Sequence, residues 1–147
     1  MAVHRGGFSF VEMLIVLVVI GIVGGITAGG FTQMRASQEA RAGITSIRQI
    51  ISQGATSASS RGIPLELVRS GNKLEVRALN ATVLHSVALP SALAAQFPSS
   101  GAWLNFNAVG RVGYPSSFWA NPKTLTSGGK SYQLSISLIG EIKVVKQ

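Results

Sequence analysis

Residues 8–31, F-S-F-V-E-M-L-I-V-L-V-V-I-G-I-V-G-G-I-T-A-G-G-F, decide the fold, because this stretch carries no charge except Glu12. A helix of about 20 apolar residues crosses a hydrocarbon core of roughly 30 Å, whereas the apolar part of a secretory signal has only about 7–15 residues. The stretch therefore predicts a retained single-pass anchor over residues 8–31. Arg5 on its amino-terminal flank favours leaving that end in the cytoplasm and carrying the rest of the chain across the membrane.

The residues that precede and open this stretch, G-G-F-S-F-V-E at 6–12, resemble the processing site of type IV prepilins and type II secretion pseudopilins. The resemblance implies that a prepilin peptidase removes residues 1–7 as a leader, cuts after Gly7 and methylates the new amino terminus at Phe8. It also implies an inner-membrane protein whose carboxy-terminal domain lies in the periplasm or outside. That protein then joins a pilus or pseudopilus filament, with a major pilin and other minor pilins or pseudopilins as partners.

Glu12 stands at the fifth position of the expected mature chain. A carboxylate inside a membrane helix costs about 2.5–3.5 kcal/mol unless it finds a partner. In a filament the amino group of a neighbouring Phe8 supplies that partner, so the resemblance implies that Glu12 sets the axial register. The alternative is a plain membrane anchor whose Glu12 reaches head-group water, and the complete G-F-x-x-x-E pattern favours assembly.

Glycines mark two further features of the apolar stretch. Gly21, Gly25 and Gly29 follow at four-residue spacing and would let another helix approach closely, although small residues without a specific contact explain the spacing equally well. The pairs at 24–25 and 29–30 oppose helix by up to about 1 kcal/mol per glycine relative to alanine, which predicts bending or local melting there.

Residues 32–61 continue the helix with an amphipathic pattern, so that a helix from Phe8 to about Ala58 extends far beyond a membrane. The apolar positions recur three or four residues apart and predict the face that packs on a domain. They are Met34, Ala40, Ile44, Ile47, Ile50 and Ile51. The arginines at positions 35, 41 and 48 fit a solvated helix face better than a nucleic-acid contact.

Residues 62–147 show the alternation of antiparallel strands, so we expect an α+β protein with the pilin fold. Its long amino-terminal helix, membrane-spanning in its first half, packs on a carboxy-terminal antiparallel sheet. The expected strands are 65–69, 73–79, 82–89, 104–107, 131–138 and 142–144, with turns at 70–72 and 139–141, a turn or bulge at 110–113, and loops at 91–100 and 116–129. Phe97 is expected to plug the first loop, and charges on the first hairpin predict cross-strand ion pairs.

Two segments of this domain, residues 106–110 and 136–144, resemble the GspH/FimT-type minor pilins and pseudopilins. Some FimT-type members bind DNA through a G-R-x-R element in the final hairpin. The corresponding residues here are G-E-I-K at 140–143, which place Glu141 where the first arginine would stand. This difference weakens the expectation of DNA binding.

Basic residues nevertheless keep DNA binding open as an alternative. The chain has no aspartate, five glutamates and thirteen lysines and arginines, giving a net charge of +8 that favours anionic partners. Arg111, Lys123 and Lys143 are the candidate contacts, with aromatic rings nearby that can stack on single-stranded bases. A small core filled by aromatic side chains, with the cations solvated, is the favoured interpretation. Those aromatic residues are Trp103, Phe106, Phe118 and Trp119.

No catalytic, metal or cofactor site is expected. His4 lies in the leader, His85 is a lone histidine, and the chain offers neither cysteine nor aspartate to pair with it. The favoured function is a structural subunit, a minor pilin or pseudopilin of a type IV pilus or type II secretion-like filament. The absence of a cysteine-closed loop favours a minor over a major subunit. The alternative is a DNA-binding minor pilin of a competence pilus that takes up DNA.

Overall fold

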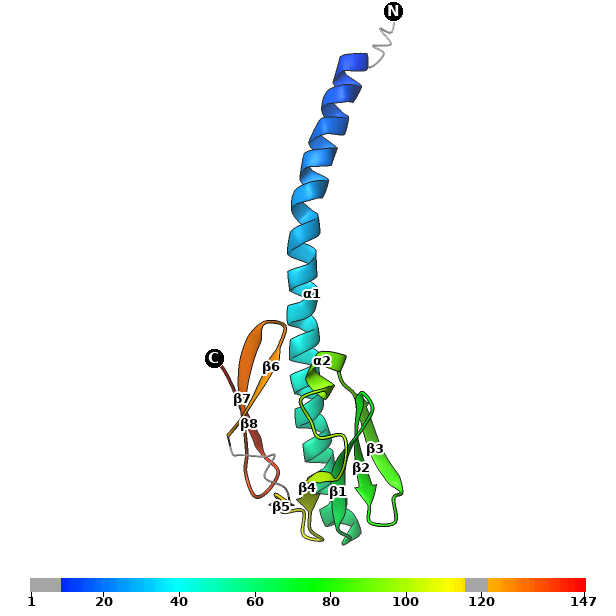
Figure 1. The fold of residues 1–147 in the computed structure, drawn as a ribbon, viewed down its shortest axis with the longest axis vertical. Helices are drawn as coiled ribbons and strands as arrows, with labels where there is room; N and C mark the ends of the chain where they lie inside the picture. Colours follow the sequence, from blue (N-terminus) through cyan, green and yellow to red (C-terminus); the bar gives the residue numbers. More distant parts are fainter. Residues whose placement is uncertain (1–8, 116–121) are drawn as a thin grey trace, which may run out of the picture. The chain divides into compact units, whose positions relative to one another are not determined.

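The computed structural model describes residues 9–115 and 122–147, and within residues 26–30 it describes the backbone alone. A single long helix, α1 (Phe10–Arg61), comes first and is followed by a β-rich region (Figure 1). The chain divides into two compact units, Met1–Arg35 and Ala36–Gln147. The first contains the apolar part of α1, and the second contains the rest of α1 together with all the strands.

The carboxy-terminal end of α1 is closed by a glycine. Gly62 has φ +65°, a left-handed conformation that glycine adopts without steric cost. The N–H of Ile63 donates to the carbonyl of Ala58 at 3.3 Å, which is the six-to-one bond of a Schellman motif. Pro64 follows and cannot continue the helix. The predicted end of the helix is therefore confirmed.

Five antiparallel strands form the larger sheet, in the order β3-β2-β1-β4-β5. The first predicted hairpin is confirmed, with Leu67 opposite Val76 and both side chains buried. The turn or bulge predicted at 110–113 is wrong in position: the chain turns at 107–110, and residues 112–113 pair with β4. The strands are β1 (Leu65–Ser70), β2 (Lys73–Ala78), β3 (Val83–Ala88), β4 (Ala102–Phe106) and β5 (Val112–Gly113).

A second sheet of three antiparallel strands, β6 (Lys123–Ser127), β7 (Lys130–Ile136) and β8 (Ile142–Lys146), was not foreseen as a separate layer. The loop predicted over 116–129 is wrong at 123–127, which form β6. Residues 116–121 lie outside the described part of the chain. The predicted final hairpin is confirmed, but β7 ends earlier than expected. Leu138 lies in the turn and is 65% exposed.

The segment between β3 and β4 contains a short helix, α2 (Ser91–Ala94), where a loop was predicted. Pro90 fixes an extended backbone before it, and Leu93 and Ala94 turn inward, which a single helical turn accomplishes. Phe97 is buried as predicted and packs against Trp103, with ring centroids 4.8 Å apart.

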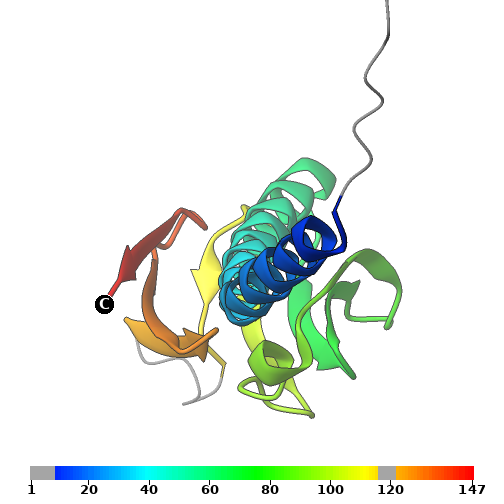
Figure 2. The same cartoon turned by 90° about the horizontal axis from the view of Figure 1, so that it is seen from above.

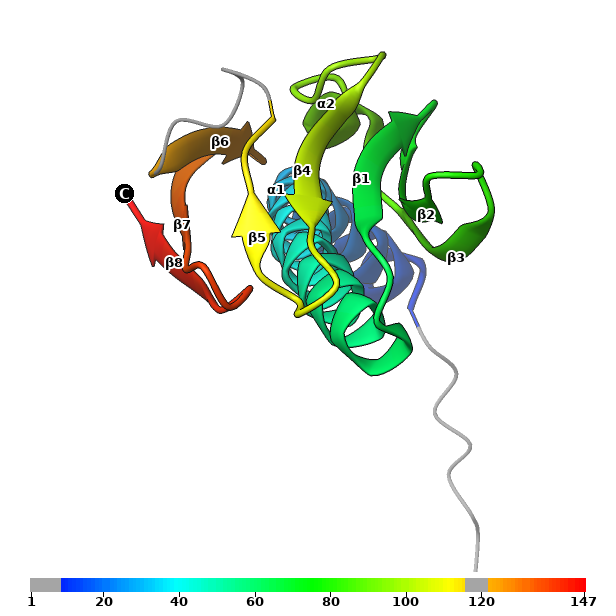
Figure 3. The ribbon, with the colours of Figure 1, turned by 90° about the horizontal axis from the view of Figure 1, so that it is seen from below.

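The core of the second unit lies where the strands of both sheets curve around the carboxy-terminal half of α1 (Figures 2 and 3). The predicted apolar face of the helix is buried there, except that Met34 is 61% exposed and lies in the first unit. Gly54 lets the sheet approach: a Cβ at this position would lie 2.5 Å from Cε2 of Phe106. The buried helix residues are Ala40, Ile44, Ile47, Ile50, Ile51, Ala55 and Ala58.

Two hydrogen bonds join the β5 edge of the larger sheet to the end of β7 and the turn that follows it. The hydroxyl of Tyr114 donates to the carbonyl of Ile136 at 2.9 Å, and the N–H of Val112 donates to the carbonyl of Leu138 at 2.9 Å. Burial raises the pKa of the Tyr114 phenol above its usual value. The two layers are therefore held as parts of one compact unit.

The cross-strand ion pairs predicted for the first hairpin are wrong. Among the described residues the ion pair on this hairpin joins Arg77 to Glu75, two positions apart on β2, with Nε donating to Oε2 at 2.9 Å. Side chains two residues apart share one face of a strand, so the partners are already adjacent. Arg69 instead donates to the carbonyls of Gly71 and Phe97, at 2.7 and 2.8 Å.

Candidate functional site

The amino-terminal part of α1 exposes apolar side chains on every side. Twelve large apolar residues between positions 10 and 23 are 46–81% exposed. A helix that is apolar all round is normally buried, either in a protein core or in a membrane. They are Phe10, Val11, Met13, Leu14, Ile15, Val16, Leu17, Val18, Val19, Ile20, Ile22 and Val23.

Within the part of the chain that the structure describes, no helix is long and apolar enough to cross a membrane.

Glu12 lies in the first turn of α1 and already has a partner within the chain. The N–H of Ser9 donates to its Oε2 at 3.2 Å, and the N–H of Val11 donates to Oγ of Ser9 at 3.2 Å. Ser9 is thus the N-cap, and the two side chains together form a capping box that satisfies two backbone donors. A carboxylate at this end of the helix also interacts favourably with the helix dipole.

The capping role of Ser9 was missed from the sequence, although its signal was present. S-F-V-E at residues 9–12 fits the S-x-x-E pattern that precedes an apolar run. Gly7 and Phe8, where cleavage and methylation are predicted, lie outside the described residues.

The glycines of the apolar segment are open. Beyond the adjacent residues and the nearby backbone of the helix itself, a Cβ placed at Gly21, Gly24 or Gly25 would meet no described atom within 4 Å. Gly29 belongs to the segment whose side chains are not described. The backbone is helical through both glycine pairs, so the predicted local melting is wrong for the single chain. The seam remains a prediction about a neighbouring helix.

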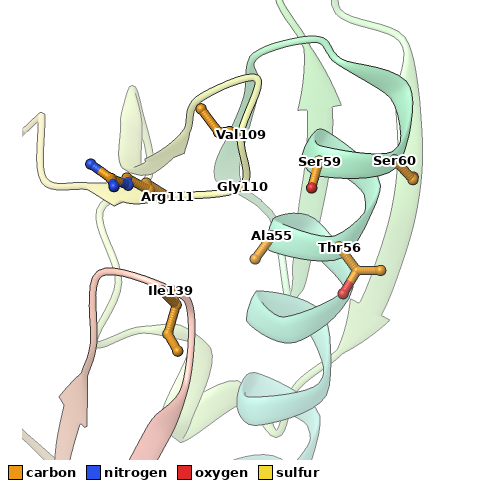
Figure 4. A pocket seen from close by; sticks show the side chains of 8 residues that line it. All are labelled: Ala55, Thr56, Ser59, Ser60, Val109, Gly110, Arg111 and Ile139. Atoms are coloured by element: carbon orange, nitrogen blue, oxygen red, sulfur yellow. The ribbon is translucent and has the colours of Figure 1, made fainter.

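Arg111, the first candidate DNA contact, is exposed beside a cavity of about 440 Å³. Oδ1 of Asn107 accepts from the N–H groups of Val109 and Arg111, at 3.1 and 2.8 Å, and so fixes the turn that carries this arginine. Its side chain points away from Ser59 on α1, while Ile139 of the next turn faces the same cavity (Figure 4).

The structure does not bring Lys123 and Lys143 together. Lys123 pairs with Leu134 of β7, and Leu134 pairs with Val144 of β8. Because side chains of paired residues share a face, Lys123 lies on the same face of the sheet as Val144. Lys143 precedes Val144 and therefore points to the other face of the sheet. Phe118 and Trp119, the expected aromatic neighbours, lie outside the described residues.

His85 has a polar partner that the sequence did not reveal. Its Nε2 lies 2.7 Å from Oγ of Ser57, which links the edge strand β3 to α1. Among residues 9–115 and 122–147, no acidic side chain hydrogen-bonds to this histidine, and no group of three His, Cys, Asp or Glu side chains is placed to hold a metal. The pair serves as a helix–sheet contact.

Comparison with known protein families gives a match at the amino-terminal end. Residues 3–28 match the family described as the prokaryotic N-terminal methylation motif. This range includes the expected cleavage site, Glu12 and most of the exposed apolar segment. No curated protein and no solved structure matches the chain significantly.

Proposed function

Because this chain carries the prokaryotic N-terminal methylation motif of type IV pilin-like proteins, we propose that it is a minor pilin or pseudopilin of a pilus or secretion filament. The motif implies processing by a prepilin peptidase, an amino-terminal segment anchored in the inner membrane, and assembly with other pilins. In our proposal the chain is a single-pass protein with its second unit in the periplasm, and it leaves the membrane when it enters the filament.

The exposed apolar surface of α1 between residues 10 and 23 carries this proposal. Burying a large apolar side chain contributes about 1.5–3 kcal/mol, so twelve of them left in water would favour aggregation. A membrane covers such a surface before assembly, and the helices of neighbouring subunits cover it afterwards. A pilin-like subunit occupies both environments in turn, the membrane before assembly and the filament afterwards.

Charge supports a minor rather than a major subunit. Residues 36–147 contain eleven lysines and arginines but only four glutamates. Copies of so basic a domain repel one another, whereas a domain surrounded by acidic neighbours is attracted to them. A GspH/FimT-type identity fits the confirmed final hairpin, β7–β8, and is part of the proposal.

Glu12 provides the test, because substitution affects its two interactions differently: the hydrogen bond from the N–H of Ser9 and the proposed pairing with a neighbouring amino terminus. Glu12→Gln keeps a side-chain oxygen for the N–H of Ser9 but loses the charge that attracts a neighbouring amino terminus. We expect Glu12→Gln and Glu12→Ala to be cleaved and retained in the membrane, yet missing from sheared filaments. Ser9→Ala, which removes the cap but keeps the carboxylate, is the matched control and should enter filaments.

The measurement is an immunoblot of sheared filaments and membranes from cells that express each variant. Incorporation of Glu12→Gln at the level of the unaltered protein would refute the charge-pairing role. Exclusion of Ser9→Ala to the same extent as Glu12→Gln would show that the filament also requires the Ser9 cap, so that charge pairing alone would not account for the role of this helix start.

The surplus of cations favours DNA binding as a second candidate, through which the same subunit would serve uptake by a competence pilus. Arg111 and Lys143 are both exposed. Because Lys123 and Lys143 point to opposite faces of their sheet, such binding would use one of these surfaces rather than all three residues.

A further inference from the structure

A basic groove lies between α1 and the three-stranded sheet, within the second unit. Its cavity measures about 330 Å³. Three cationic side chains, Arg41, Arg48 and Lys146, form its rim together with Thr45. Its floor is formed by Ile44, Tyr132 and Val144.

The fold fixes the positions of the rim residues. Arg41 and Arg48 are seven residues apart on α1, so they project from one face of the helix, roughly 10 Å apart along its axis. Thr45 lies between them, and all three are exposed. Lys146 comes from β8, where it pairs with Tyr132 of β7, and thus approaches from the opposite wall.

The side chains of the rim cations have no partner within the described part of the chain, where no side-chain hydrogen bond or ion pair involves Arg41, Arg48 or Lys146. Some other cations of the second unit are engaged, such as Arg77 with Glu75 and Lys130 with Oγ of Ser37 at 3.0 Å. Glu39 is the acidic residue of α1 nearest in sequence, but residues two apart on a helix do not face each other. The groove therefore concentrates uncompensated positive charge.

We propose that this groove binds an acidic peptide segment of a neighbouring, different subunit, an inference that rests on the proposed filament function. Carboxylates of the segment pair with Arg41 and Arg48, whose planar guanidinium groups bind carboxylates through two parallel hydrogen bonds. An apolar side chain between them packs on the floor formed by Ile44 and Val144.

The chemistry of the floor favours a peptide over a nucleic acid. A phosphodiester backbone gains little from contact with aliphatic side chains, and single-stranded bases stack on exposed aromatic faces. Tyr132 is only 5% exposed and offers none. An acidic peptide with an apolar residue uses both the rim and the floor.

A second copy of this chain is a poor occupant. Of the four glutamates in residues 36–147, Glu75 is already paired with Arg77, and Glu66 is half-buried. The remaining two, Glu39 and Glu141, belong to a unit with a large positive excess. The acidic segment must therefore come from another kind of subunit.

The test measures binding of the peptide fluorescein-Glu-Glu-Leu-Glu-Glu-NH₂, labelled at its amino terminus, to the full-length protein in detergent micelles, by fluorescence anisotropy at 0.15 M salt. We expect saturable binding that Arg48→Glu and Lys146→Glu each weaken by about tenfold or more. Lys143→Glu is the matched control, because it makes the same charge change on β8 but on the opposite face, and it should shift affinity by no more than about twofold.

The proposal is overturned if Lys143→Glu weakens binding as much as Lys146→Glu, or if the peptide does not bind. It is also overturned if a peptide with glutamine in place of glutamate binds equally well, or if duplex DNA displaces the labelled peptide and loses affinity in the same two groove variants. Circular dichroism checks that the variants fold. Because Arg48 lies on α1 and Lys146 on β8, damage to one element does not explain weaker binding by both variants. Peptide binding involves neither cleavage nor Glu12, so its failure leaves the proposed function standing, whereas an uncleaved chain refutes the function whatever the peptide does.

Discussion

Glu12 has one hydrogen-bonding partner in the single chain and a different one in the proposed filament. The bond from the N–H of Ser9 lowers the cost of placing a carboxylate at the start of an apolar helix. A neighbouring amino terminus offers a charge-assisted bond, which is roughly twice as strong as one between neutral groups. Exchange of partners on assembly thus follows from ordinary hydrogen-bond energetics.

For Gly54→Ala, helix propensity and the packing seen in the structure predict opposite effects on stability. From the sequence, Gly54→Ala should stabilise a helix by up to about 1 kcal/mol. In the structure the added methyl group would meet the fully buried ring of Phe106 at 2.5 Å, and overpacking of this kind costs about 1–3 kcal/mol. We expect a net loss of about 1–2 kcal/mol in the unfolding of residues 36–147 by urea.

A second substitution separates the steric effect from other causes. In the double variant Gly54→Ala with Phe106→Leu, the smaller side chain leaves room for the methyl group, so adding Gly54→Ala to Phe106→Leu should cost little. Equal costs of Gly54→Ala in both backgrounds would contradict the close approach of helix and sheet.

Among the elements, those with a strict period were predictable. L-E-L at the start of β1 and residues 131–136 of β7 alternate apolar and polar side chains, and each was expected within a strand. K-T-L-T-S, which forms β6, has one large apolar residue, Leu125, and its other inward position is Ser127. This segment is a strand because it pairs with β7, and no local sequence pattern predicts that pairing. The division of the strands into two sheets depends on the same long-range pairing.

Leu125 tests whether β6 is a strand of the core or the loop that its sequence suggests. Its side chain is fully buried, so Leu125→Ala should destabilise residues 36–147 by about 2–5 kcal/mol in urea unfolding. Thr124→Ala, its exposed neighbour, should change stability by less than about 0.5 kcal/mol. Similar small effects at both positions would support a loop.

Over the whole molecule, the DNA-binding candidate makes a prediction about salt. A domain that contacts several phosphates releases counterions, and with 6–10 contacts its affinity falls by about 10³–10⁵ between 50 and 200 mM salt. This candidate predicts such a dependence for residues 36–147, with weaker binding by Arg111→Ala, in a filter-binding titration. Absence of binding at low salt would eliminate it.

The whole chain was predictable in outline, because the motif at residues 6–12 and the apolar stretch after it are local signals. The candidate site was predictable only in part. Glu12 was recognised, but the basic groove joins Arg41 and Arg48 of α1 to Lys146 near the other end of the chain. Residues so far apart in sequence meet only through the packing of β8 beside the helix.

Intact-mass spectrometry of the protein extracted from membranes and filaments tests the central claim, processing as a pilin-like subunit, most directly. Cleavage after Gly7 and methylation predict a single species with the mass of residues 8–147 plus one methyl group, so that the chain begins at methylated Phe8. Cells that lack the prepilin peptidase should contain the full chain instead. A full-length mass in cells with an active peptidase would show that the chain is not processed as a pilin-like subunit.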